Sequence, residues 1–203
     1  QYQDTSDNSA DFELSEIATS SATTTSSATT TSSATSTQQA TTTQDATTTQ
    51  QATTSVQANL LDVVINEIAW MGTQASYTDE WIELYNNTNQ EINLAGWQIV
   101  WAANSTSSKT INLTSSILPY GFYLLERTAS TTVFDITEDQ TYVGNLSNSG
   151  EKLELKDPQG NVIDLVDCSA GWFAGDNSTK KTMERKSPVI SGNNQTNWAS
   201  NNT

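Results

Sequence analysis

The sequence predicts an all-β fold, a sandwich or a barrel, for the C-terminal part of this 203-residue chain. Short runs that alternate apolar and polar residues, or that combine β-branched and aromatic ones, recur at intervals of roughly 8–12 residues. Turn-forming sequences rich in Asn, Gly, Pro and Ser separate these runs. No segment of this part has the apolar repeat of an amphipathic helix.

The clearest runs lie within residues 63–101, where the sequence reads VVINEIAW, DEWIELYN and INLAGWQIVW. Side chains alternate between the two faces of a strand, so Ile82 and Leu84 share one face of the second run. Trp81 and Tyr85 share the other face. This pattern is typical of a half-buried antiparallel sheet.

Eight strands are expected in all, at residues 62–70, 79–86, 96–102, 109–114, 121–126, 141–144, 151–156 and 161–167. The last two should form a hairpin, because residues 157–160 read Asp-Pro-Gln-Gly, a type I turn followed by glycine. The final strand, VIDLV, is apolar on both faces, which favours a central position in its sheet. Beyond Cys168 the pattern is irregular, and Trp172 and Trp198 are expected to pack this arm against the sandwich.

The residues before this domain have a different composition. Residues 1–17 carry five acidic and no basic residues, and residues 18–58 consist almost entirely of Thr, Ser, Ala and Gln. Such segments cannot offset the ~1–2 kcal/mol per residue that backbone ordering costs. We therefore expect a disordered acidic segment at 1–17, a low-complexity linker at 18–58, and one folded domain at 60–203.

Charge and composition exclude several classes of function. The chain has 8 basic and 23 acidic residues, a net charge of −15, which argues against nucleic acid as a partner. It has no histidine, so Ser-His-Asp, Cys-His and histidine–metal sites cannot be built. Its one cysteine cannot form an internal disulfide. No apolar run approaches the ~20 residues of a membrane-spanning helix, so no membrane insertion is expected.

The chain resembles a known family over about residues 62–200. The segments VVINEIAW, DEWIELYN, NLAGWQI, LPYGFYLLER, LSNSGEKLELKDPQGNVIDLV, TMERK and a final NW occur in the order seen in bacterial lamin tail domains. The resemblance implies an immunoglobulin-like β-sandwich that acts as a non-catalytic module. Members of the family occur in secreted or surface proteins, often beside nucleases, other hydrolases or adhesion domains.

The resemblance also directs attention to Glu67, Glu80 and Glu83, the acids of the family's motif. Neighbouring carboxylates could bind Ca²⁺, the only cofactor considered for this chain, or act as an acid/base pair. A structural role is favoured over both. In that interpretation, Glu67 and Glu83 form an ion pair with Arg185 of TMERK.

Two aromatic residues are candidates for ligand binding. Trp81 and Tyr85 lie on the face opposite Ile82 and Leu84, where exposed rings could stack on sugars. Burial of both rings under the arm at residues 168–198 is the favoured alternative.

The sequence therefore predicts a non-catalytic extracellular or cell-surface module, for binding, adhesion or spacing, within a larger bacterial surface or secreted protein. Its expected partner is a protein or a cell-surface polysaccharide. The alternatives are a glycan-binding accessory domain of a secreted hydrolase or nuclease, and a structural subunit that self-associates through an open sheet edge.

Overall fold

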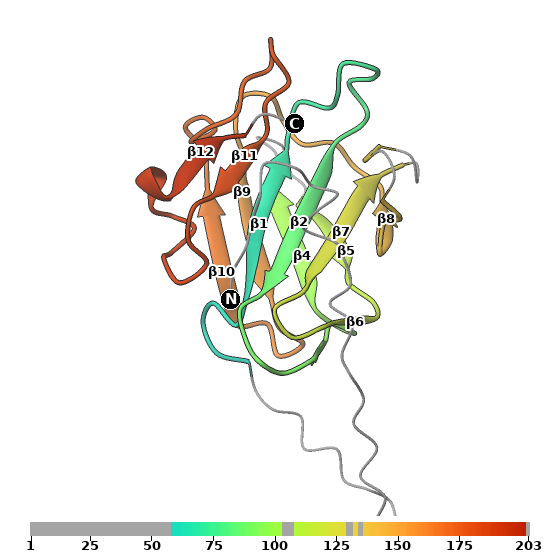
Figure 1. Cartoon of the computed structure of the whole chain (residues 1–203), viewed down its shortest axis with the longest axis vertical. Coiled ribbons are helices and arrows are strands. Elements are labelled where there is room, and N and C mark those ends of the chain that lie inside the picture. The colour runs from blue at the N-terminus through green and yellow to red at the C-terminus, as the bar shows by residue number, and fades with distance from the viewer. Residues whose placement is uncertain (1–57, 103–107, 129–131, 134–135, 202–203) are drawn as a thin grey trace, which may run out of the picture. The chain divides into compact units, whose positions relative to one another are not determined.

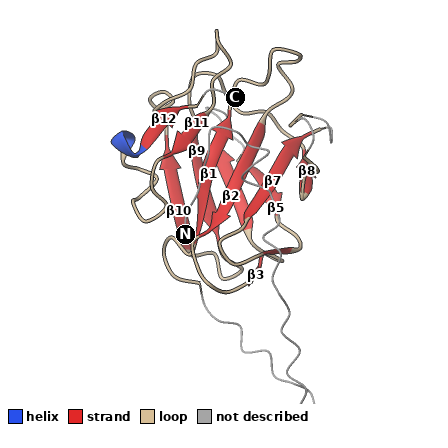
Figure 2. Ribbon diagram, viewed as in Figure 1, coloured by secondary structure: helices blue, strands red, loops and turns tan. Residues whose placement is uncertain are grey.

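The computed structural model describes residues 58–201, except 103–107, 129–131 and 134–135 (Figure 1). The predicted acidic segment at 1–17 and all but the last residue of the predicted linker at 18–58 lie outside the described residues. Strands make up nearly all the regular structure (Figure 2). They form two main sheets that pack face to face, the immunoglobulin-like β-sandwich that the sequence predicted.

The larger sheet has six strands in the order β12-β11-β1-β2-β7-β8. In chain order these are β1 (Val63–Ala69), β2 (Trp81–Asn86), β7 (Phe122–Arg127), β8 (Gln140–Tyr142), β11 (Met183–Arg185) and β12 (Trp198–Ser200). Neighbours are antiparallel except β7 and β8, which are parallel. The sheet therefore combines strands from both ends of the domain.

The smaller sheet has the order β10-β9-β4-β5. Its strands are β4 (Gln98–Ala102), β5 (Lys109–Asn112), β9 (Lys152–Lys156) and β10 (Val162–Asp167). A separate two-stranded sheet joins β3 (Ile92–Asn93) to β6 (Ser116–Ile117), and a 3-10 helix η1 (Gln195–Asn197) precedes β12.

All eight predicted strands are present, and β9 and β10 form the predicted hairpin. Four strands of two or three residues were not predicted: β3, β6, β11 and β12. The predicted central position of VIDLV was wrong, because β10 lies at the edge of its sheet.

The apolar character of both faces of β10 has two causes. A register shift between Val162 and Asp164 interrupts the alternation, so Ile163 and Asp164 are both buried. The arm also lies along this edge: the Asn193 side chain accepts a hydrogen bond from the Asp167 amide at 2.7 Å. An edge strand that is covered in this way can be as apolar as a central one.

The core fills the space between the two sheets. Ile82 and Leu84 are fully buried there, as the alternation of side chains predicted. Trp198 of the arm also belongs to this core, and Trp172 packs against its margin. Both tryptophans therefore attach the arm to the sandwich, as expected from the sequence.

Candidate functional site

Arg185 lies inside the sandwich and pairs with a different acid from the one predicted. Its salt bridge is with Asp164 of β10. Arg185 shares the inner face of its sheet with the core residue Met183, whereas Glu67 and Glu83 lie on the outer face of the same sheet. The predicted ion pair of Arg185 with Glu67 and Glu83 is therefore corrected: the partner comes from the opposite sheet.

The Arg185–Asp164 pair joins the two sheets through several hydrogen bonds. Asp164 accepts the Ile65 amide at 2.9 Å, and Arg185 Nε donates to the Ile65 carbonyl at 2.8 Å. Arg185 Nη1 donates to the carbonyl of Ile190 at 3.0 Å, and its guanidinium lies 5.1 Å from the Trp198 ring centroid. Both charged side chains are almost completely buried, so the pair is part of the core rather than a ligand site.

The three candidate metal ligands do not come together. Glu67 and Glu83 are cross-strand partners on the outer face, where Glu67 accepts from the Thr182 hydroxyl and Glu83 from Nδ2 of the Asn66 side chain. Glu80 is two residues before Ile82, so its side chain points to the inner face of the sheet, away from Glu67 and Glu83. Across the described part of the chain, no three His, Cys, Asp or Glu residues are placed to hold a metal ion.

The predicted sugar platform is not available at the surface. Trp81 and Tyr85 are 3 % and 1 % exposed. Trp81 packs with Leu124 on the outer face of the larger sheet, beside Val133. The ring centroids of Tyr85 and Phe122 are 5.0 Å apart. The cover over Trp81 thus includes the segment after β7 rather than the arm at 168–198, and Trp81 and Tyr85 are rejected as a ligand platform.

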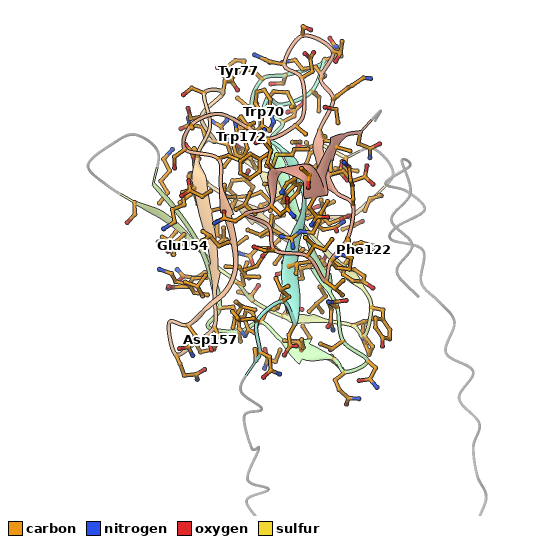
Figure 3. All side chains as sticks on the ribbon, turned by 90° about the vertical axis from the view of Figure 1, so that its left-hand side faces the viewer. Trp70, Tyr77, Phe122, Glu154, Asp157 and Trp172 are labelled. Atoms are coloured by element: carbon orange, nitrogen blue, oxygen red, sulfur yellow. The ribbon has the colours of Figure 1, made fainter. Side chains whose placement is uncertain are left out.

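Aromatic residues gather instead at one end of the sandwich, between the β1–β2 loop and the arm (Figure 3). The rings of Trp70 and Trp172 stack almost parallel, with 5.7 Å between centroids and 6° between planes. Trp70 is buried, Trp172 is half-buried, and Tyr77 is 77 % exposed. We call the end that carries these three residues the aromatic end.

The loop that presents Tyr77 is fixed by its own hydrogen bonds. The Thr73 hydroxyl accepts the amides of Ala75 and Ser76 and donates to the Asp79 carboxylate at 2.7 Å. Gly72 has φ +71°, and a Cβ there would lie 2.6 Å from the Ser76 carbonyl oxygen, so the loop closes tightly on itself. An exposed aromatic residue on a constrained loop loses little conformational freedom when it binds.

The arm completes the aromatic end from the other side. The Trp70 indole donates to the Ala174 carbonyl at 3.1 Å, and Lys180 Nζ donates to the Met71 carbonyl at 3.0 Å. A Cβ on Gly175 would lie 2.6 Å from the Trp70 indole nitrogen, so glycine permits this close approach. The aromatic end is therefore a built structure in which two distant segments interlock.

Buried ionisable groups lie beneath the aromatic end. Glu80, 4 % exposed, accepts from Arg127 at 3.0 Å and from the Leu146 amide at 2.7 Å. Glu151, 1 % exposed, accepts the Ser147 amide at 2.9 Å. Burial raises the pKa of Glu80 to about 7, against the opposing effects of the Leu146 amide and Arg127, and burial also raises the pKa of Glu151.

Several of these residues were not found from the sequence. A charged residue within the apolar run VIDLV had to be paired if buried, and this signal could have identified Asp164. Glu151 and Tyr77 carry no comparable local signal, because their roles depend on segments distant in the chain.

The comparison with known families agrees with this architecture. The family model described as Lamin Tail Domain matches residues 56–170, more than half of the chain. The chain belongs to the lamin tail domain family. A search of curated proteins found no match. In this lamin tail domain, the arm beyond residue 170 adds β11 and β12 to the larger sheet. No helix in the described segments is long and apolar enough to cross a membrane.

Proposed function

We propose that this lamin tail domain is a non-catalytic binding module of a larger extracellular or cell-surface protein, and that it binds cell-surface polysaccharide through the aromatic end. The observation that carries the proposal is Tyr77, a large aromatic side chain that is 77 % exposed on a loop fixed by hydrogen bonds. Residues of this type are the usual anchors of binding surfaces.

The chemistry of the aromatic end supports a carbohydrate ligand. Flat apolar rings can cover the faces of sugar rings, and nearby polar side chains can bind their hydroxyl groups. Asn177 and Lys180 supply such groups on the arm, where their side chains are 2.8 Å apart. The excess of acidic residues disfavours a polyanionic ligand such as nucleic acid.

The composition of the preceding segment supports an extracellular or surface location. Residues 18–58 consist almost entirely of Thr, Ser, Ala and Gln. Low-complexity segments of this composition are typical of the linkers and stalks that carry modules of surface proteins.

The sheet edges give little support to the alternative of self-association. Edge strands β5, β8 and β12 have four, three and three residues. The longer edge strand β10 is covered, since the Ile163 carbonyl accepts the Leu61 amide and Asn193 binds Asp167. Short or covered edges discourage strand pairing between molecules.

Replacing Tyr77 by alanine is expected to abolish binding without loss of stability. Thermal melts of the whole chain would identify the ligand. The chain would be melted with cell-wall polysaccharides, with peptidoglycan fragments, with duplex DNA, and with calcium in comparison with EDTA. A ligand at 100 times its Kd adds ~2.7 kcal/mol of stability, which raises the melting temperature by several degrees. Tyr77→Ala should remove that increase for a polysaccharide and leave the ligand-free melting temperature unchanged.

Tyr120 provides the matched control, because it is a second exposed tyrosine, 46 % exposed, in the loop before β7. Its φ of +52° makes asparagine the appropriate replacement. Tyr120→Asn should bind as the wild type does. If Tyr77→Ala bound polysaccharide with unchanged affinity, or if no polysaccharide bound the wild type, the proposal would be refuted.

A further inference from the structure

The buried acids beneath the aromatic end are connected to it through the backbone of two consecutive residues, Leu146 and Ser147. Leu146 donates its amide to Glu80, and Ser147 donates its amide to Glu151. The carbonyl of Ser147 accepts the indole N–H of Trp172 at 2.8 Å. Residues 146 and 147 therefore link the two carboxyl groups to the aromatic end through hydrogen bonds made by their backbone.

Glu151 is poorly stabilised as an anion. Within the described residues, Glu151 Oε2 and the Tyr142 hydroxyl are buried and have no hydrogen-bond partner. Tyr142 is 4 % exposed, and its burial, followed by the nearby charges of Glu80 and Glu151, raises the pKa of its hydroxyl. A buried carboxylate oxygen without a donor favours the protonated form of the group.

The charges that face the acids only partly compensate this effect. Arg127, at the end of β7, pairs with Glu80, and Lys109 of β5 attracts both carboxylates. Glu80 and Glu151 repel each other. Lys109 itself is engaged elsewhere, because its Nζ donates to the carbonyl and side-chain oxygens of Asn145 at 2.8 Å each.

We infer that Glu80 and Glu151 form a proton-binding site that controls the order of residues 146–147 and, through them, the position of Trp172. When both acids are ionised, two buried carboxylates repel each other and the segment opens more often. When the site holds a proton, the segment stays closed and Trp172 stays stacked on Trp70. The inference rests on the proposed function only in assigning binding to the aromatic end.

The sign of the pH dependence follows from the raised pKa values. An opened segment releases Glu80 to water, where it ionises at its ordinary pKa near 4.5, whereas the closed segment holds its pKa at about 7. Opening is therefore least favoured below pH 4.5 and becomes progressively easier until the pH passes 7. Ligand affinity at the aromatic end should accordingly be higher at pH 6 than at pH 8.

A titration of the whole chain by nuclear magnetic resonance, without ligand, tests the inference. The amide proton of Leu146 should shift with a midpoint near pH 7, the pKa of Glu80. The Ser147 amide proton and the Trp172 indole proton should follow the same midpoint, because the segment opens as a unit. Protection of the two amides from hydrogen exchange, corrected for the intrinsic rate, should fall up to about tenfold between pH 6 and pH 8.

Glu80→Gln supplies the decisive variant, since glutamine keeps an acceptor for the Leu146 amide but cannot ionise. It should abolish the Leu146 titration and the change in protection. If Glu80→Gln proves unstable, Glu151→Gln is the replacement, and it should abolish the titration and the change in protection of the Ser147 amide. Glu154→Gln is the control: Glu154 lies between Lys152 and Lys156, its pKa is lowered, and it should leave the titrations unchanged.

The outcomes separate this inference from the proposed function. Absence of a shared midpoint for Leu146, Ser147 and Trp172 between pH 5.5 and pH 8 would overturn the inference, even if Tyr77 proved essential for binding. A shared midpoint that Glu80→Gln removes would support it, even if no polysaccharide bound the protein.

Discussion

Arg185→Ala is expected to lower the free energy of unfolding by about 3–5 kcal/mol. The substitution leaves Asp164 buried on β10, where Oδ1 already has no hydrogen-bond partner in the described structure. It also removes the donors to the carbonyls of Ile65 and Ile190. The loss is large because an isolated buried charge costs more than the pair contributes.

A thermal or urea melt measures this loss, and the melting temperature should fall by roughly 10 °C or more. Without Arg185, Asp164 is free to take up a proton, so the penalty should be smaller at pH 5 than at pH 8. Lys156→Ala is the control, because its salt bridge with Glu154 lies at the surface and contributes about 0–1 kcal/mol. An unchanged melting temperature for Arg185→Ala would contradict the structural role of the pair.

Gly150→Ala is expected to destabilise the domain by a similar amount. Gly150 has φ +108°, and a Cβ there would lie 2.1 Å from the Cys168 carbonyl oxygen and 2.8 Å from Gly171. Backbone strain costs about 1–3 kcal/mol and overpacking about 1–3 kcal/mol more. The contact lies where the segment before β9 meets the start of the arm, so neither backbone can move aside independently.

Gly160→Ala separates these two costs. Gly160 has φ +85° in the β9–β10 turn, but a Cβ there would meet no atom within 4 Å. This control should therefore show the conformational penalty alone, about 1 kcal/mol. If Gly150→Ala and Gly160→Ala melted at the same temperature, the close contact between residues 150 and 168 would not exist in solution.

The strands were predictable because their patterns are local. VVINEIAW, DEWIELYN and LELK show the alternation of a half-buried sheet without reference to any partner. β11 and β12 are three residues each, too short for such a pattern. β11 forms because β1 offers it an edge, and β12 forms on the edge of β11. Short strands of this kind are fixed by tertiary contacts alone.

The candidate site was harder to predict, because it depends on which face each strand presents. Asp164 shares the inward face of β10 with Val166, and this gave Arg185 a partner that the chain order did not indicate. Trp81 and Tyr85 had the composition of a ligand platform, but their burial depends on the residues that cover the outer face. Tyr77, the exposed residue of the aromatic end, lies in a loop without strand periodicity.

The central claim is that the aromatic end is the binding surface, and a chemical-shift map tests it most directly. The polysaccharide that raises the melting temperature most would be added to the 15N-labelled protein at pH 6. The chemical shifts of the backbone amides and the indole groups would then be recorded. The account predicts changes confined to residues 70–80 and 168–181, including the Trp172 indole. Changes on the outer face of the smaller sheet, around Val100 and Glu154, with none at Tyr77 or Trp172, would contradict it.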